Sequence, residues 1–230
     1  SLNDDGSLGE QCKIGEIGVI SIYGDHVSPG YLNKQQNIGV FDNKYLNSGD
    51  LGFKDANGKI FIAGRAKDLI IRSGHNIDPA MIENAISSHP GVSIAAAVGI
   101  PDIYAGELPI CFVELLPNFD ISEEELLDHS KKLINERPAW PKIIKIIDKI
   151  PLTTVGKIFK PQLRCLATKL KVDDLLKTEF NIDNANININ LGGTKGMVVT
   201  VSLANSSEDT ISKVESILAK FTFESNIIKN

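Results

Sequence analysis

Hydrophobic and polar residues alternate in short blocks along residues 10–64, a pattern typical of β-rich structure. The apolar run from Ile17 to Tyr23 predicts one strand. Asn57 and Gly58 stand between two further apolar runs, and an Asn-Gly pair in that position is a strong signal for a tight β-hairpin. Residues 1–64 are therefore expected to form a β-rich subdomain.

Residues 65–170 mix the spacings of strands and helices. Strands are predicted at 69–72, 92–100 and 108–116, helices from Pro79, from Ser122 to about Glu136 and at 160–170, and an apolar and basic segment lies at 142–150. Asp78 suits the N-cap of the first helix. Ser122 and Glu125 form a capping box at the start of the second. This order predicts a small mixed α+β domain built on a three-stranded sheet.

Residues 171–230 follow a pattern of their own. Strands are predicted at 181–190, where Asn and Ile alternate, at 197–203 and at 223–228, with a helix from Ser206 to about Phe221 before the last strand. The glycine-rich stretch Leu191–Gly196 suits the turn between the first two strands. The segment is expected to be a small ββαβ tail, and the whole chain to have an α+β fold.

The composition is that of an ordinary globular protein, with 42% hydrophobic and 23% charged residues in a chain of 230. The net charge of −5 argues against a nucleic-acid partner, no apolar run approaches the roughly 20 residues of a membrane span, and Ser1–Gly6 have no features of a signal peptide. Cys12, Cys111 and Cys165 are too widely spaced for a CxxC metal or redox motif. We therefore expect a cytoplasmic protein with no metal site, whose cysteines are buried as small hydrophobic residues.

One segment of this acidic chain is locally basic. Eight lysines and arginines lie between Arg137 and Lys169, against a single acidic residue, Asp148. A solvated surface explains such a segment, and a polyphosphate ligand is the more specific alternative.

Asp50, Arg65 and Lys67 are candidate ligand-binding residues near the end of the β-rich segment. Asp50 follows Ser48-Gly49, where a carboxylate can accept two hydrogen bonds from vicinal hydroxyls such as those of ribose, although a turn aspartate is the simpler interpretation. Arg65 stands at the end of a predicted strand and could hold a ribose or a phosphate. Lys67 adds a compact charge, and a solvent-exposed basic turn explains both cations equally well.

Two later glycine-containing turns offer further candidates. Ser73-Gly74-His75-Asn76 predicts a tight turn along which an extended ligand could pass close to the backbone. His75 has no Ser, Asp or Cys at a recognisable spacing, so a catalytic triad is not expected. Lys157 ends the polar loop Thr153–Lys157, from which a mobile ammonium group could reach an anion. This loop is not a Walker A motif, because Ile158 follows the lysine in place of Ser or Thr.

In order along the chain, these motifs resemble the C-terminal part of the adenylate-forming, or AMP-binding, enzymes, which include acyl-CoA synthetases, luciferases and adenylation domains of peptide synthetases. The matching positions are Gly15–Gly18, Gly24, Gly30-Tyr31, Gly49-Asp50, Gly64–Asp68, Gly74–Ile77, Pro79, Glu83, Gly99–Asp102, Pro151–Thr153 and Gly156-Lys157. The resemblance covers roughly residues 10–165. Within it, the segment from Gly64 to Ile77 is most similar to the fatty acyl-CoA synthetases.

The resemblance implies a ligase that activates a fatty acid or other carboxylic acid with ATP and Mg²⁺, releases pyrophosphate, and transfers the acyl group from AMP to CoA. It implies that Lys157 bridges the carboxylate and the α-phosphate during adenylation. It also implies that Asp50 holds the ribose hydroxyls, that Arg65 contacts ribose or phosphate, and that Lys67 is the hinge of a domain rotation. Gly74 and His75 would then line the pantetheine tunnel in the second half-reaction.

The family's phosphate loop, adenine motif and acyl pocket have no match in this chain, and Met81 replaces an acidic residue that many members have. Residues 1–64 are expected to be the last β subdomain of the large N-terminal domain, 65–170 the mobile C-terminal domain, and 171–230 a tail of unknown role. The isolated chain is expected to be inactive. The alternatives are an enzyme that makes acyl-adenylates for an acyl carrier protein, and a regulatory or protein-interaction module centred on 171–230.

Overall fold

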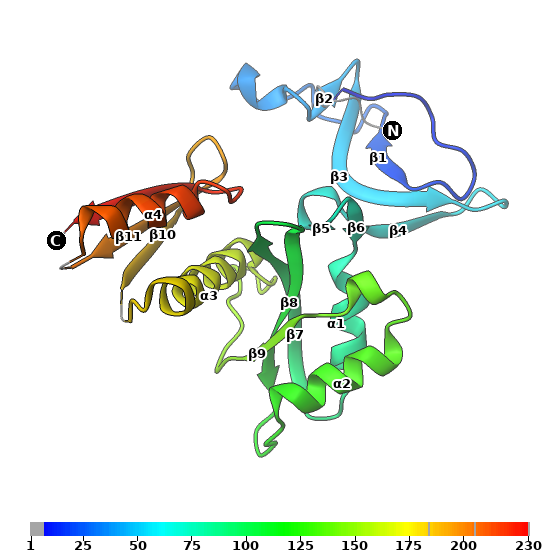
Figure 1. Ribbon diagram of the computed structural model, residues 1–230. Helices are drawn as coiled ribbons and strands as arrows, with labels where there is room; N and C mark the ends of the chain where they lie inside the picture. Colours follow the sequence, from blue (N-terminus) through cyan, green and yellow to red (C-terminus); the bar gives the residue numbers. More distant parts are fainter. Residues whose placement is uncertain (1–6, 184, 205, 230) are drawn as a thin grey trace. The chain divides into compact units, whose positions relative to one another are not determined.

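The computed structural model describes residues 7–183, 185–204 and 206–229 (Figure 1). The chain divides into two compact units, Ser1–Leu69 and Ile70–Asn230. Most strand pairs are antiparallel and the helices do not alternate regularly with the strands, so the α+β class is confirmed. Ser1–Gly6, on which the expectation of no signal peptide rests, lie outside the described residues.

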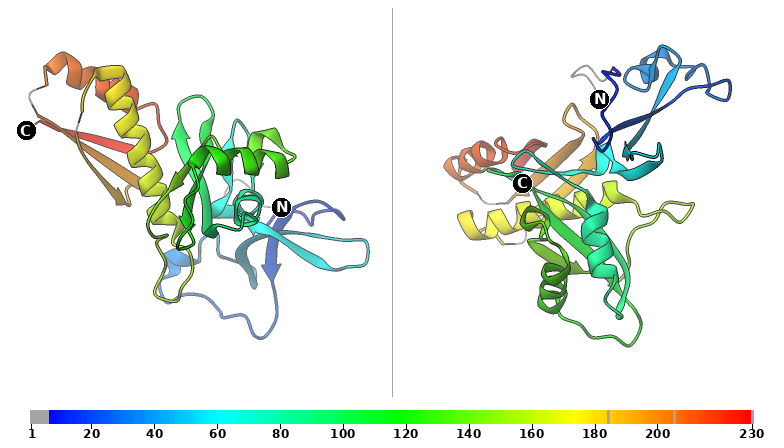
Figure 2. Two further views of the ribbon diagram at one scale, coloured as in Figure 1. Left: turned by 90° about the horizontal axis from the view of Figure 1, so that it is seen from below. Right: turned by 90° about the vertical axis from the view of Figure 1, so that its right-hand side faces the viewer.

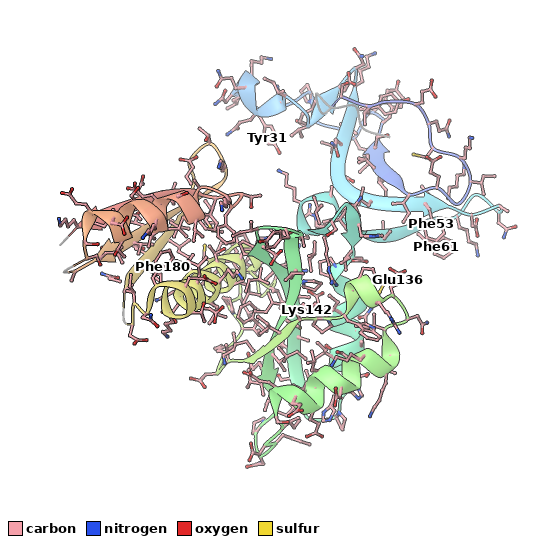
Figure 3. The ribbon with its side chains drawn as sticks, in the orientation of Figure 1. Tyr31, Phe53, Phe61, Glu136, Lys142 and Phe180 are labelled. Carbon is pink, nitrogen blue, oxygen red and sulfur yellow. The ribbon has the colours of Figure 1, made fainter. Side chains whose placement is uncertain are left out.

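The first unit is a four-stranded antiparallel sheet. Its elements are β1 (Gly18–Ile22), η1 (Lys34–Asn37), β2 (Phe41–Asp42), β3 (Tyr45–Lys54), β4 (Ile60–Arg65) and η2 (Ala66–Asp68), where η marks a 3₁₀ helix. Strand β3 pairs with the other three. The predicted hairpin joins β3 to β4, with Gly58 at φ 82° in its turn, and the Phe53 and Phe61 rings stack across it with centroids 5.2 Å apart (Figure 3).

The first unit has little interior of its own. In its described part no hydrophobic side chain is buried, and large apolar residues such as Leu32 and Ile38 are 104% and 76% exposed. Exposed apolar surface on this scale is typical of a region that another part of a protein covers.

The second unit begins with a five-stranded sheet and its helices. These elements are β5 (Ile70–Arg72), β6 (His75–Ile77), α1 (Pro79–Ser87), β7 (Val92–Asp102), β8 (Gly106–Leu115), α2 (Glu123–Leu133), η3 (Arg137–Ala139), β9 (Ile143–Ile146) and α3 (Lys160–Phe180). The strand order is β6-β5-β8-β7, and β9 pairs with β8 in parallel. The sequence predicts three strands, and that number is too low, because β6 forms directly after a two-residue turn and β9 joins the sheet beside β8.

Helices cover both faces of this sheet (Figures 1 and 2). On one face α1 and α2 form a core that includes the fully buried Ile82, Leu126 and Ala97. On the other face α3 forms a second core that includes Leu163 and Ala96. Successive residues of a strand point to opposite faces, so Ala96 and Ala97 of β7 enter different cores. The sheet is therefore a central layer, which explains the continuous apolar pattern of β7.

Helix α3 is longer than the sequence suggests. It was expected at 160–170 but continues to Phe180, and Asn181 ends it in the left-handed conformation with φ 53°. Neither Gly nor Pro interrupts the segment after Pro161, and Asn is one of the residues that tolerate the left-handed C-terminal position. The second half of α3 packs through Val172 and Leu176 into the core of the tail.

The tail forms the expected ββαβ unit. Its elements are β10 (Asn186–Leu191), β11 (Met197–Leu203), α4 (Glu208–Leu218) and β12 (Glu224–Lys229). The sheet order is β10-β11-β12, with β10 antiparallel and β12 parallel to β11. Asn184, inside the first predicted strand, lies outside the described residues. No helix among the described residues is long and apolar enough to cross a membrane.

Candidate functional site

Asp50 and Arg65 lie opposite each other on β3 and β4. The Nε atom of Arg65 is 3.0 Å from Oδ1 of Asp50, and the two side chains are 64% and 37% exposed. Asp50 is thus part of a strand, and the interpretation of it as a turn residue is wrong. Side by side, this carboxylate and guanidinium offer an acceptor for hydroxyl groups and a planar donor for phosphate oxygens.

A β-bulge determines how Asp50 is presented. Three residues of β3, Ser48 to Asp50, face the single residue Ile20 of β1. The Ser48 hydroxyl donates to the Ile20 carbonyl at 2.8 Å and accepts from the Asp50 amide at 3.1 Å. Gly49 has φ 75°, which explains why a glycine occupies this place. Bulges bend a strand and redirect its side chains, here at the position of the candidate carboxylate.

Lys67 is exposed in η2, which follows β4 directly. The first unit ends at Leu69 and the second begins at Ile70. Lys67 therefore stands close in sequence to the boundary of the two units, and its role as a hinge stays a prediction.

Gly74 and His75 belong to a two-residue hairpin between β5 and β6. Ser73 has φ 49° and Gly74 has φ 82°, as in a type I′ turn, and Arg72 pairs with His75 across it. Apart from Gly74 and its two chain neighbours, no heavy atom of the described residues lies within 4 Å of the position that a Cβ on Gly74 would take. The turn therefore presents bare backbone to open space, and His75 is exposed beside it.

Contacts from β8 and from the loop before it hold this hairpin in place. The Ser73 amide donates to the Ala105 carbonyl at 2.8 Å. The Ile71 amide donates to Oε2 of Glu107 at 2.9 Å. On the other side, the Arg72 guanidinium donates to the Pro138 carbonyl at 2.7 Å.

Lys157 is exposed at the base of a second small hairpin, which precedes α3 and is yellow-green in Figure 2. The Thr153 amide donates to the Lys157 carbonyl at 2.7 Å, and the Lys157 amide donates back to Oγ1 of Thr153 at 3.1 Å. Gly156, with φ 80°, donates its amide to the Thr153 carbonyl. This is a three-residue turn closed by a left-handed glycine, so the backbone beside Lys157 has a defined shape although its side chain is exposed.

Residues 81–157 match the family model described as the AMP-binding enzyme C-terminal domain. The chain contains the C-terminal domain of the adenylate-forming enzymes. Marinolic acid–CoA ligase of Pseudoalteromonas sp. (strain SANK 73390) is 38% identical over 224 residues, which take in 97% of this chain and 34% of that protein. The alignment therefore includes most of the tail, and the chain spans about a third of the length of this relative.

Two solved structures agree in fold with this chain. ATP-bound MatB from Rhodopseudomonas palustris has a TM-score of 0.66 and 30% identity, covering 72% of this chain and 33% of that one. The o-succinylbenzoate coenzyme A synthetase of Bacillus subtilis, solved with ATP and a magnesium ion, has a TM-score of 0.61 and 31% identity, covering 67% and 32%. The resemblance stated from the sequence motifs is thus confirmed.

The candidate residues of this chain fall into two groups. Asp50, Arg65 and Lys67 belong to the first unit, and the Gly74 hairpin and Lys157 to the second. Three carboxylates that contact segments beside these hairpins were not among the predicted candidates, namely Glu83, Glu107 and Glu114. Glu83 was quoted only as a motif position, and nothing in the spacing of the other two marks them.

The basic segment 137–169 is less cationic in the fold than in the sequence. Lys145 lies 3.1 Å from Glu123, and Lys160 lies 2.8 Å from Glu83, both acidic partners from outside the segment. The Arg137 guanidinium lies over the Trp140 ring, 5.7 Å from its centroid. Lys145, Lys160 and Arg137 therefore have structural partners already, and a polyphosphate ligand for this segment remains a prediction.

Only one of the three cysteines is buried. Cys111 is fully buried in the α1–α2 core, whereas Cys12 and Cys165 are half-buried. Burial, aided by the nearby Glu83 carboxylate, raises the pKa of the Cys111 thiol far above its usual value, so this thiol is unreactive. In residues 7–183, 185–204 and 206–229, no group of three His, Cys, Asp or Glu side chains could hold a metal ion.

Proposed function

We propose that this chain is the C-terminal region of an ATP-dependent acyl-CoA synthetase. The complete enzyme would convert a fatty acid or another carboxylic acid, ATP and CoA into acyl-CoA, AMP and pyrophosphate by way of an acyl-adenylate. The observation that supports this most is the exposed Lys157 on a shaped hairpin, in a chain whose relatives are named as CoA ligases. In this proposal 1–64 would be the last β subdomain of the N-terminal AMP-binding domain, 65–170 the mobile C-terminal domain, and 171–230 a tail.

Lys157 supplies the positive charge for adenylation in this proposal. Its ammonium group bridges the attacking carboxylate and the α-phosphate, where negative charge develops in the transition state. Charge placed in advance at such a position is usually the largest contribution to catalysis. The hairpin fits this role because its backbone is fixed by its own hydrogen bonds while the side chain stays exposed.

Asp50 and Arg65 bind the nucleotide. Asp50 accepts hydrogen bonds from the ribose hydroxyls, and Arg65, held 3.0 Å away, contacts the ribose or the phosphate. The described residues of this chain do not form a cluster that fits Mg²⁺, so the ion of the complete reaction would be held by ATP and by the rest of the enzyme.

The Gly74 hairpin acts in the second half-reaction. Its bare backbone and open surroundings suit the close passage of an extended pantetheine arm, with His75 beside it. Lys67 is the hinge about which the domain rotates between adenylation and transfer to the thiol. CoA is the thiol we favour, because the curated relatives are named as CoA ligases.

The test separates the two half-reactions in the complete enzyme. Lys157→Ala should depress ATP–pyrophosphate exchange on the order of 10²–10³-fold, and leave thioester formation from preformed acyl-adenylate intact. Lys149→Ala, which removes an exposed lysine just before the same loop, is the matched control. Equal losses in both half-reactions for Lys157→Ala would refute the role.

Two further measurements address the alternatives. The isolated 230-residue chain should show no pyrophosphate exchange with any carboxylic acid, and robust exchange would contradict the proposal.

Mass spectrometry should detect acyl-CoA when the complete enzyme receives CoA. Intact adenylation without that product would favour transfer to a carrier protein.

A further inference from the structure

Glu83 of α1 binds two groups at once. Its Oε1 atom lies 2.8 Å from Nζ of Lys160 and accepts the Ala97 amide at 2.9 Å. The Glu83 and Lys160 side chains are only 20% and 15% exposed, so their attraction is little screened by water. Lys160 is the first residue of α3 and directly follows the hairpin that contains Lys157.

The free edge of β7 explains this arrangement. Strand β7 is the last in the order β6-β5-β8-β7, so within the described part of the chain amides such as that of Ala97 have no strand partner on their outer side. Glu83 satisfies that amide, and Lys160 comes to the same carboxylate from the helix on the opposite face of the sheet. The ion pair thus ties the start of α3 to α1 around the strand edge.

A second carboxylate fixes the beginning of the Lys157 hairpin. Oε2 of Glu114, from β8, accepts the Ile150 amide at 2.8 Å, just before the loop starts. Between Ile150 and Lys160 the two arms of the hairpin are joined by a hydrogen bond from the Phe159 amide to the Pro151 carbonyl. The loop is therefore held at both ends, by Glu114 before it and by the Glu83–Lys160 pair after it.

The Gly74 hairpin has a carboxylate support of its own. Oε2 of Glu107 accepts the Ile71 amide at 2.9 Å, next to the turn. The Glu107 carboxylate lies against Gly99 of β7, and a Cβ at that position would overlap it. Gly99 does not have a positive φ, so its backbone conformation does not require glycine. Glycine is required here because it leaves space for the Glu107 carboxylate.

We propose that Glu83 and Glu107 are separate positioning residues for the two half-reactions. Glu83, through Lys160, fixes the Lys157 hairpin for adenylation, and Glu107 fixes the Gly74 hairpin for thioester formation. This inference rests on the function proposed above for the two hairpins. Because the two supports share no residue, removing one impairs its own half-reaction and spares the other.

The experiment measures both half-reactions in the complete enzyme. Glu83→Gln should lower pyrophosphate exchange by up to about 10²-fold, the scale of a displacement of about 1 Å at a reacting group, without slowing thioester formation from acyl-adenylate. Glu107→Gln should slow thioester formation from acyl-adenylate without lowering pyrophosphate exchange. Gly99→Ala, which displaces the Glu107 carboxylate, should have the same effect as Glu107→Gln. Lys160→Arg should retain most of the adenylation activity because it keeps the ion pair.

Glu123→Gln is the matched control. Glu123 of α2 uses the same construction, with Lys145 Nζ at 3.1 Å and the Ile146 amide at 3.1 Å, but it supports β9 and neither hairpin. The double variant Glu83→Gln/Lys160→Met guards against misfolding, because it leaves no unpaired buried charge. It should fold, and lose adenylation as Glu83→Gln does.

Hydrogen exchange on the 230-residue chain gives a readout independent of activity. Glu83→Gln should raise exchange in 151–159 and not in 70–77, and Glu107→Gln should do the opposite. Full adenylation by the double variant, or equal losses in both half-reactions, would overturn the inference. Lys157→Ala, measured in parallel, distinguishes failure of the proposed function from failure of this inference. An enzyme that still forms acyl-adenylate with Lys157→Ala refutes the proposed function. If Lys157→Ala is inactive but Glu83→Gln is active, only the positioning role of Glu83 is refuted.

Discussion

Two leucines of α3 test how this chain is divided into stable parts. Leu163 and Leu176 are both fully buried on the same helix. Leu163 belongs to the core beneath the five-stranded sheet, and Leu176 belongs to the core of the tail. Replacing either by Ala leaves helix propensity unharmed, since Ala is the best helix former, so the effect reports packing alone.

The cost of each change follows from burial. Truncating a fully buried Leu to Ala typically removes about 2–5 kcal/mol, from lost transfer free energy and the remaining cavity. At about 3 kcal/mol the unfolded population of the affected part rises about 10²-fold. For a urea dependence of about 2 kcal/mol per molar, the midpoint of that part falls by about 1.5 M.

Hydrogen exchange read by mass spectrometry on the 230-residue chain can locate the loss. Leu176→Ala should raise exchange in β10, β11 and β12 and leave β7 and β8 protected. Leu163→Ala should raise exchange in β7 and β8 and in the hairpin before α3. If both variants expose the same peptides to the same degree, the two cores unfold as one cooperative unit and the reasoning is wrong.

Three other predictions concern single residues. Hydrogen bonds from Thr194 and Lys195 lower the pKa of the Glu224 carboxyl below 4.5. The stability of the tail should therefore fall as the pH drops from about 4.5 through the lowered pKa. The variant Glu224→Gln should make the melting temperature less dependent on pH over this range. Gly74→Val, which strains a backbone at φ 82°, should slow thioester formation and spare pyrophosphate exchange. Asp50→Asn should raise the KM for ATP in that exchange, and an unchanged KM contradicts ribose binding.

Local rules predicted much of the fold. The Asn57-Gly58 hairpin forms where expected, and Gly58 takes the left-handed conformation that its turn requires. Asp78 and Ser122 cap their helices, accepting from the amides of Ala80 and Glu125. These features depend on residues within a few positions of each other, which is why a single sequence reveals them.

Features that depend on distant partners were not predictable. Asp50 looked like a turn residue because the bulge that keeps it in β3 is defined by Ile20 on another strand. Lys160 looked like part of a free cationic surface because its partner Glu83 precedes it by most of the domain. The spacing of residues along the chain does not reveal contacts between distant segments. The candidate site residues could therefore be predicted, but the carboxylates that contact the segments beside them could not.

The location of the supports bears on the proposed rotation about Lys67. If one domain presents the Lys157 hairpin first and the Gly74 hairpin later, each hairpin must keep its shape while the domain moves. Glu83, Glu107 and Glu114, with the groups they bind, all lie within the unit Ile70–Asn230. A rotation about Lys67 therefore breaks none of these contacts, and neither hairpin has to be rebuilt between the half-reactions. Substitutions at Lys67 should accordingly change the rate of switching, while the exchange protection of both hairpins in the 230-residue chain stays the same.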